Sequence, residues 1–311
     1  MEFTLYAAGA SYPSVEALKK KLGYPQLHSQ ILEKKQILEY VNYKKEHPEC
    51  QTKLFIDSGA FTAHTKGTTI DVDAYINFLN EIDDYITIFA QVDHIPGIRG
   101  QEKTIEQQLE APKKSWENYL YMVDKVKSPK KLIPVFHQGE DFAWLKNMCE
   151  YQYADGSYID YIGISCNKEL TSKEWNFWFQ KCFKVIHESK NPNVKTHAFG
   201  MTSYKVLEQF PFTSSDSTTW VRCAAFGSII VDGKTVYCSK VNKDRPDYIY
   251  NQNPAMIEAV EKRCKELGFN LTDICECENA ELRIQFNIAS LHEWAKNYKY
   301  KGTNQFKEEL W

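Results

Sequence analysis

The sequence lacks the features that would place it in several specialised classes of protein. None of its 311 residues lies in a run approaching the roughly 20 apolar residues that a membrane-spanning helix needs. The formal net charge is only -3, so no global field of one sign is available to attract a polyanion. The first residues lack the basic and long apolar regions of a signal peptide. We therefore expect a cytoplasmic protein that has no membrane partner.

The cysteines do not form the dense framework of a small disulfide-rich domain. There are nine of them, an odd number, and they are scattered through apparently regular segments. In a reducing compartment such thiols are expected to be small buried side chains. Only Cys275 and Cys277 are closely spaced.

A glycine-rich phosphate loop is also missing. The first apolar run continues into Ala7-Ala-Gly-Ala-Ser-Tyr-Pro13, which does not match the G-x-G-x-x-G turn of an open dinucleotide-binding sheet. This argues against a doubly wound sheet, the main alternative for an α/β chain of this length.

What the sequence does contain is a regular alternation of short apolar runs and longer amphipathic segments. Such an alternation predicts βαβ units and a parallel sheet. The expected strands cover 3–8, 54–57, 86–93, 132–137, 159–165, 195–199, a short run ending at Asp216, and 224–231. The expected helices between them cover 29–45, 72–82, 105–126, 142–151, 172–188 and 203–209.

Eight expected strands predict an α/β fold of the (β/α)8 TIM-barrel type, which takes about 250 residues. We assign residues 1–250 to a catalytic barrel. Residues 251–311, with expected helices over 255–267 and 280–298, are interpreted as a small helical C-terminal appendage packed on the barrel.

Three acids stand at or just after the ends of expected strands. Asp57 follows Leu-Phe-Ile and precedes Ser-Gly, Asp93 ends the run from Ile88, and Asp216 follows Phe-Thr-Ser-Ser. A barrel gathers the carboxyl ends of its strands at one mouth, where such folds place their chemistry. Two or more carboxylates there can divide the roles of nucleophile and general acid or base.

Simpler interpretations apply to single residues of this set. Asp57 alone could cap the turn that follows it, and Asp93 with His94 could be a metal pair, although no further ligand is suitably spaced. His137 and His197 each end a strand and could equally be hydrogen-bonded histidines inside the barrel. Trp220 is expected to pack in the core, with a stacking platform beside the site as the alternative.

The ordered motifs resemble those of tRNA-guanine transglycosylases, which are (β/α)8 barrels. Asp57-Ser-Gly-Ala-Phe61 is similar to the family's Asp-Ser/Thr-Gly-Gly-Phe, and Asp216 stands where the family has its nucleophile. Asp93 stands at the family's base-recognition aspartate. Three further matches are His137-Gln138-Gly139, Tyr161-Ile-Gly163 and Phe199-Gly200-Met201. The resemblance covers about residues 54–231.

The chain also departs from that pattern. Gly59-Ala60 replaces a Gly-Gly pair, and Asp216 is followed by Ser217-Thr-Thr-Trp220 instead of the family's Cys and Pro-Thr-Arg. We also expect the chain to lack the family's RNA-binding extensions. A short, divergent barrel of this kind looks more like the phage and bacterial 7-deazaguanine DNA transglycosylases. If a phage encodes it, its compartment would be the cytoplasm of the bacterial host.

The resemblance implies that the enzyme exchanges guanine in DNA for a 7-deazaguanine, such as 7-cyano-7-deazaguanine, through a covalent aspartyl–sugar intermediate. Asp216 would be the nucleophile and Asp57 the acid–base residue. The implied base-binding residues are Ser58, Gly59, Asp93, Gln138, Gly139, Gly163, Gly200 and Met201. DNA and the free bases would be its partners, and no cofactor is implied. The alternatives are a tRNA-guanine transglycosylase, a non-catalytic nucleic-acid-binding barrel and a metal-dependent barrel hydrolase.

The family's structural zinc site, Cys-x-Cys-x-x-Cys with a distant His, is incomplete in this chain. Cys275 and Cys277 fit, but Ala280 occupies the third position. A zinc ion would then need Cys264 and His292 from neighbouring helices to complete four ligands. We favour reduced thiols over a zinc site.

A basic and aromatic segment follows the last expected strand. Cations for phosphates and rings for bases are what a strand-binding groove requires. We therefore predict nucleic-acid contacts, with a solvated surface hairpin as the alternative, at Lys234, Tyr237, Lys240, Lys243 and Arg245.

Overall fold

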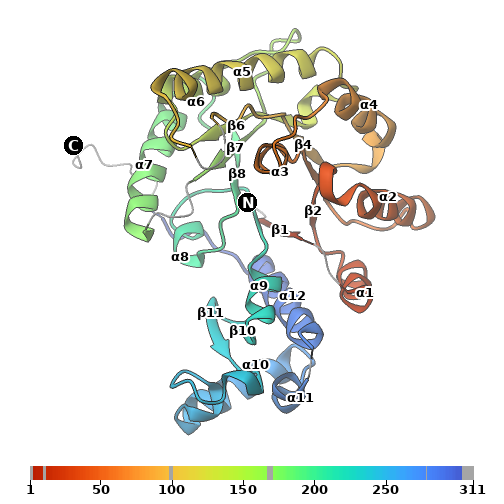
Figure 1. Cartoon of the computed structure of the whole chain (residues 1–311), viewed down its shortest axis with the longest axis vertical. Coiled ribbons are helices and arrows are strands. Elements are labelled where there is room, and N and C mark those ends of the chain that lie inside the picture. Colours follow the sequence, from red (N-terminus) through yellow and green to blue (C-terminus); the bar gives the residue numbers. More distant parts are fainter. Residues whose placement is uncertain (1–2, 10–11, 98–100, 167–170, 278, 303–311) are drawn as a thin grey trace.

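Nine parallel strands form a nearly closed barrel surrounded by helices, a TIM-barrel-like fold (Figure 1). The computed structural model describes residues 3–9, 12–97, 101–166, 171–277 and 279–302. The strands are β1 (Thr4–Ala8), β2 (Gln26–Ser29), β3 (Leu54–Asp57), β4 (Ile88–Ala90), β5 (Leu132–Ile133), β6 (Val135–His137), β7 (Tyr161–Ser165), β8 (Lys195–Phe199) and β9 (Ser214–Ser217).

The helices that follow these strands cover the outside of the barrel or its mouth. They are α1 (Pro13–Leu22), α2 (Gln30–Glu46), α3 (Ala60–Thr65), α4 (Val72–Ile82), α5 (Ile105–Val123), α6 (Phe142–Glu150), α7 (Ser172–Glu188), α8 (Tyr204–Leu207) and α9 (Thr219–Ala225). Two short 3-10 turns, η1 (Asp83–Tyr85) and η2 (Pro129–Lys131), precede β4 and β5.

The barrel closes through a strand that proline divides into two pieces. The strand order is β5-β4-β3-β2-β1-β9-β8-β7-β6, so its two edges are consecutive in the chain and only Pro134 separates them. Proline has no N–H to give to a ladder. Its carbonyl oxygen nevertheless accepts from the Gly163 N–H at 2.8 Å, and the Ile133 carbonyl accepts from the Gln91 N–H at 3.1 Å. The run 132–137 thus occupies one strand position and joins both edges.

With β5 and β6 counted as one strand position, the barrel has the eight positions expected from the sequence, but not all are filled by the expected segments. The sequence prediction missed β2, because Gln-Leu-His-Ser shows no apolar run, although it pairs with β1 and β3. It wrongly placed 224–231 in the barrel. Residues up to Ala225 belong to α9, and β10 (Ser228–Val231) pairs antiparallel with β11 (Lys234–Tyr237) in a separate sheet. Because β9 already pairs with β1, the barrel has no free edge there with which β10 could pair.

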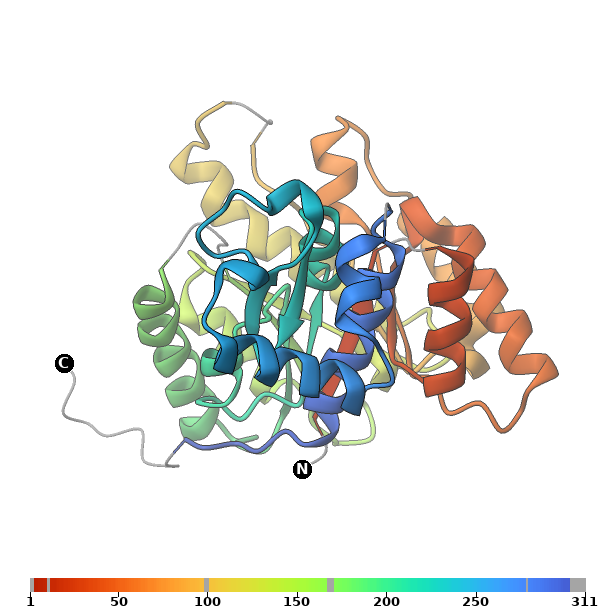
Figure 2. The same ribbon diagram turned by 90° about the horizontal axis from the view of Figure 1, so that it is seen from below.

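The appendage has a hydrophobic core of its own. It comprises the β10–β11 hairpin, η3 (Lys240–Asn242), η4 (Ile249–Asn251), α10 (Pro254–Glu266), α11 (Leu271–Glu276) and α12 (Glu281–Lys296). Its buried side chains begin at Ile229 and include Val260, Ile274 and Phe286. This core therefore starts before the boundary expected at residue 250. Figure 2 shows the appendage, in cyan and blue, in front of the barrel.

Helix α12 joins the appendage to the barrel. The ring of Phe3 stacks on Tyr298, just beyond this helix, at 4.3 Å and meets Trp294 edge-on at 5.6 Å. The buried Asn287 side chain accepts from the Ile230 N–H at 2.7 Å and donates to the Trp220 carbonyl at 2.8 Å. These contacts explain why a polar residue is fully buried on this helix.

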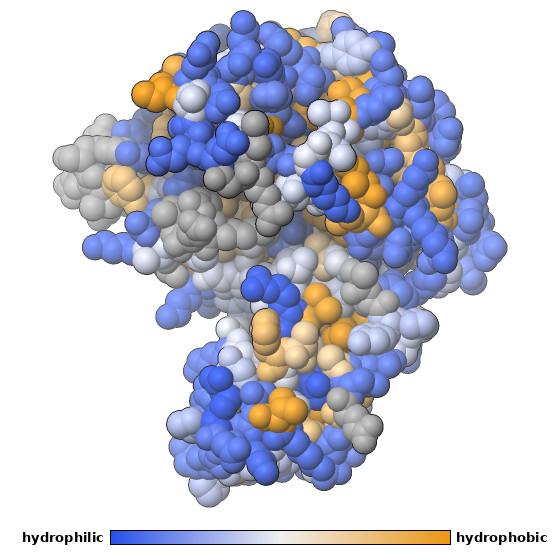
Figure 3. All heavy atoms as spheres, in the orientation of Figure 1, coloured by the Kyte–Doolittle hydropathy of each residue, from blue (hydrophilic) through white to orange (hydrophobic). Residues whose placement is uncertain are grey.

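Apolar side chains fill the barrel interior and the layer between sheet and helices. Hydrophilic residues predominate on the face of the molecule that Figure 3 shows. The interior cluster includes Tyr6, Leu27, Phe55, Ile133 and Val135. Trp220 is fully buried, and its indole N–H donates to the carbonyls of Ala8 and Ser217, so the prediction of a core position is confirmed. No helix in the described ranges is both long and apolar enough to span a bilayer.

Candidate active site

The parallel strands bring the predicted acids to one end of the barrel, which we call the mouth. Asp57 is the last residue of β3, Asp216 lies on β9, and Asp93 follows β4 by three positions. His137 ends β6 and His197 lies on β8. All these strands run in the same direction, so their carboxyl ends share this mouth.

Asp216 is a buried carboxylate held at one of its two oxygens. Its Oδ1 accepts from the Gly200 N–H at 2.6 Å and lies 3.3 Å from His197 Nε2. Both Asp216 and His197 are buried, at 8% and 0% exposure. Burial lowers the pKa of His197, and contact with Asp216 only partly opposes this. The imidazole is therefore neutral near pH 7.

Asp93 belongs to a second acid–histidine pair, which has the opposite charge state. His137 Nε2 lies 3.3 Å from Asp93 Oδ2, and its Nδ1 lies 3.1 Å from Glu140 Oε1. Gln91 Nε2 donates to Asp93 Oδ1 at 2.6 Å. Burial alone would lower the pKa of His137, but the carboxylates of Asp93 and Glu140 outweigh it and raise the pKa to about 10. This imidazole is therefore a cation at neutral pH.

Asp57 is the acid that the site perturbs most clearly. Burial raises its pKa most, and the negative charges of Asp93 and Asp216 raise it further. The Gly59 N–H donates to its Oδ2 at 3.1 Å and, with the Ser58 N–H, lowers the pKa in part. The resulting pKa is about 7, so protonated and ionised forms coexist near neutrality.

Two of the predicted glycines have clear structural reasons. Gly59 has φ 79°, in the left-handed region, and a Cβ there would lie 2.6 Å from Ser29 Oγ. A Cβ on Gly163 would lie 2.5 Å from the ring of Phe199, which fills the barrel interior beside it. The roles of Gly59 and Gly163 in binding a base stay predictions.

The other predicted base-binding residues are also near the mouth. Gly200 serves Asp216 through its N–H, and Met201 and Ser58 are buried at 2% and 1% exposure. The Gln138 N–H donates to the Ser165 carbonyl at 2.9 Å, which fixes the start of the turn containing the exposed Gly139. Their contacts with a base stay predictions.

Sequence reasoning overlooked several polar partners of these residues. Glu140 holds His137 by its backbone N–H as well as its ring, at 3.1 Å each, and its spacing of three residues was a usable signal. Gln91 precedes Asp93 by two positions within the same run. Ser214 on β9 bonds to His197, and Tyr161 on β7 bonds to Ser214; no local pattern could have shown this.

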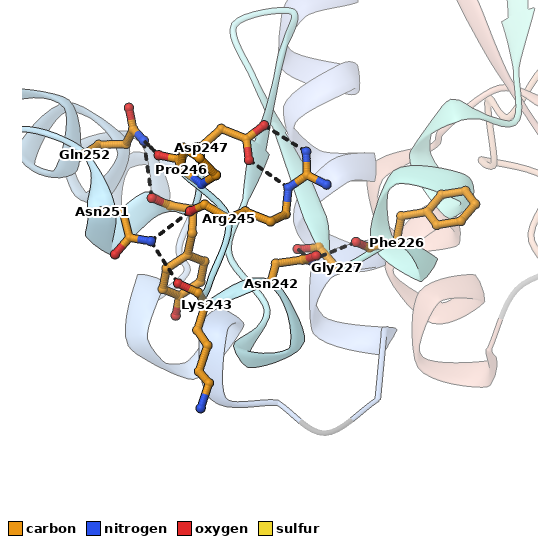
Figure 4. Close-up of polar contacts among 10 residues, drawn as sticks. Phe226, Gly227, Asn242, Lys243, Arg245, Pro246, Asp247, Asn251 and Gln252 are labelled. Atoms are coloured by element: carbon orange, nitrogen blue, oxygen red, sulfur yellow. Dashed lines mark hydrogen bonds and ion pairs between the residues drawn. The ribbon is translucent and has the colours of Figure 1, made fainter.

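The basic and aromatic segment is exposed, but its charges are partly engaged (Figure 4). Arg245 forms two hydrogen bonds with Asp247, at 2.7 and 3.0 Å, and lies 3.8 Å over the Tyr237 ring. Lys240 lies 3.6 Å from Glu276. The Lys243 ammonium points away from the other labelled residues in Figure 4. Lys234 is exposed on β11.

The four residues considered for zinc do not form one group. Cys264 and Cys275 are buried in the appendage core, whereas Cys277 donates to the Asn279 carbonyl at 2.6 Å. The His292 ring instead packs against Tyr24, at 5.1 Å between centroids. Within the described residues, no group of three or more His, Cys, Asp or Glu side chains could hold a metal ion. His94 is exposed, and its backbone N–H bonds to Ser115.

The mouth thus combines a fixed carboxylate, an acid with pKa about 7 and a carboxylate beside a cationic histidine. Comparison with protein-family models and with curated proteins finds no match for this chain.

Proposed function

We propose that this protein is a transglycosylase that exchanges guanine in DNA for a 7-deazaguanine base such as 7-cyano-7-deazaguanine. The observation that carries the proposal is the convergence of Asp57, Asp93 and Asp216 on one mouth, with three different environments. Carboxylates whose environments differ in this way can take different roles in one reaction.

We assign the role of nucleophile to Asp216. Two donors hold Oδ1, and no hydrogen bond from the described residues reaches Oδ2. In the proposed first step Oδ2 attacks C1′ of the deoxyribose, and the C1′–N9 bond breaks as the O–C1′ bond forms. The bond electrons leave with guanine. The aspartyl–sugar ester keeps the DNA strand covalently bound until the second base arrives. Retaining glycosidases form a covalent intermediate of the same kind.

Asp57 would move the proton that each step requires. In its protonated form it can neutralise the departing guanine, and it is then a carboxylate. As a carboxylate it can take the proton from N9 of the incoming 7-deazaguanine, which attacks C1′ and releases Asp216. A pKa of about 7 makes both forms available at neutral pH.

Asp93 would recognise the base. Guanine presents two adjacent donors, its ring N–H and its exocyclic amine, and an ionised carboxylate has about four acceptor positions. Gln91 and His137 occupy one position on each oxygen, which leaves acceptor capacity for both donors of the base.

The polymer must offer its target nucleotide outside the base stack, because C1′ and its base cannot reach the mouth from within a duplex. The decisive experiment incubates the protein with radiolabelled guanine and either DNA or tRNA. Label in DNA, and none with Asp216→Asn, would support the proposal. Label in tRNA alone would favour the tRNA enzyme, and label in neither would refute base exchange.

A further inference from the structure

A buried hydrogen-bond chain runs through the barrel interior to Asp216. The Tyr161 hydroxyl on β7 lies 2.5 Å from Ser214 Oγ on β9, which in turn lies 2.5 Å from His197 Nδ1 on β8. His197 Nε2 then lies 3.3 Å from Asp216 Oδ1. Ser214 and His197 are both fully buried.

The donor and the acceptor of each bond in this hydrogen-bond chain follow from the Asp216 end. As a nucleophile Asp216 is an ionised carboxylate, which can only accept, so His197 Nε2 must carry a hydrogen. A neutral imidazole has only one N–H, so Nδ1 must accept from the Ser214 hydroxyl. Ser214 has then used its only hydrogen and must accept from Tyr161.

The surroundings of His197 prevent other arrangements of the ring. Aromatic rings meet it edge-on, with centroid distances of 4.8 Å from Phe55, 4.5 Å from Phe199 and 5.9 Å from Tyr6. Gly163 is the residue that makes room for Phe199. An imidazole packed on its sides by rings and bonded at both nitrogens has a fixed orientation.

We propose that His197 is a positioning residue for Asp216, with its tautomer set by the Asp216 carboxylate and its ring held by Ser214 and Tyr161. Its Nε2–H and the Gly200 N–H together fix Oδ1, which leaves Oδ2 as the attacking oxygen. This role rests on the proposed function, but the tautomer itself is a property of the resting protein.

The first test is therefore independent of activity. Nitrogen-15 NMR of the histidine rings distinguishes an N–H from a bare nitrogen, with His197→Gln identifying the resonance. We expect His197 as the Nε2–H tautomer. Ser214→Ala should keep this tautomer, because the Asp216 carboxylate still needs the Nε2 hydrogen, but should leave Nδ1 without a donor. A wild-type Nδ1–H tautomer would overturn the proposal, even if the protein exchanges bases.

The second test separates positioning from mere packing. His197→Gln keeps a donor near the Nε2 position, whereas His197→Leu keeps bulk without a donor. Poor alignment at a nucleophile costs up to about 100-fold in rate. We expect His197→Leu to lose about 10–100-fold in kcat with an unchanged KM for the free base, and His197→Gln to recover most of it.

Equal kcat in the wild type and His197→Leu would refute the positioning role. If His197→Leu does not fold, the tautomer measurement and Ser214→Ala, which should lower kcat while Tyr161→Phe lowers it less, decide the question. Failure of the wild type to exchange any base would refute the proposed function, and the tautomer assignment would be judged on the NMR result alone.

Discussion

Replacing Asp57 by Asn should stabilise the folded protein above neutral pH. The pKa of Asp57 is about 7 in the folded state, compared with an ordinary value of 3.8. A carboxyl whose folded pKa is raised contributes stability that is fully present below the unfolded pKa and is lost as pH rises through the folded pKa. Between about pH 4 and pH 7, this group therefore makes the wild type progressively less stable.

The size of the effect follows from the same difference. About three pH units correspond to about 4 kcal/mol at 1.36 kcal/mol per unit. Asp57 is only intermediate in exposure, so solvent screening reduces this, and we expect about 2–3 kcal/mol. An Asn side chain removes the charge and still accepts from the Gly59 N–H.

Urea unfolding at pH 4.5 and pH 8.5 measures this prediction. Asp57→Asn should be about 2–3 kcal/mol more stable than the wild type at pH 8.5 and within about 1 kcal/mol of it at pH 4.5. Asp84→Asn, at an exposed acid, is the matched control and should follow the wild type at both values. Parallel pH profiles for Asp57→Asn and the wild type would show that Asp57 titrates normally, and would remove the acid–base argument.

Three further predictions concern the reaction and the polymer. Asp216→Asn should abolish base exchange and the denaturation-resistant nucleic acid adduct, reducing the rate by several orders of magnitude; an active variant would exclude the covalent mechanism. Asp93→Ala should weaken binding of free guanine, by about 1–3 kcal/mol for each donor left unpaired, as measured by calorimetry; unchanged affinity would mean that Asp93 does not read the base. Replacing Lys240, Lys243 and Arg245 together by Ala should weaken nucleic acid binding without changing affinity for the free base. The salt slope should fall by nearly one unit for each phosphate that these side chains neutralise in the wild type. An equal slope would place the groove elsewhere.

The sequence predicted the fold class because long-range order left a local trace in most strands. The expected strands over 54–57 and 195–199 coincide with β3 and β8, and periodic segments over 72–82 and 172–188 coincide with α4 and α7. β2 left no such trace, because its polar residues are buried by neighbours that are distant in the chain.

The same distinction holds for the candidate site. Asp57, Asp93 and Asp216 could be found because each directly follows or belongs to a strand-like run. Their charge states could not be found in this way. The pKa of Asp57 depends on its burial and on two acids that are distant in the sequence. The opposite states of His137 and His197 depend on burial and on how many carboxylates face each ring. Only the assembled barrel contains that information.

The placement of β1 has a consequence for how the chain folds. The first strand of the sequence lies between β2 and β9, so one of its two partners is made about 200 residues later. The ring of Phe3, just before this strand, packs on Trp294 and Tyr298 near the end of the described chain. Contacts of such high sequence separation slow folding. During synthesis β1 must wait with an unpaired edge beside an uncovered aromatic ring, and we expect this interval to be when the protein is most prone to aggregation and most dependent on chaperones.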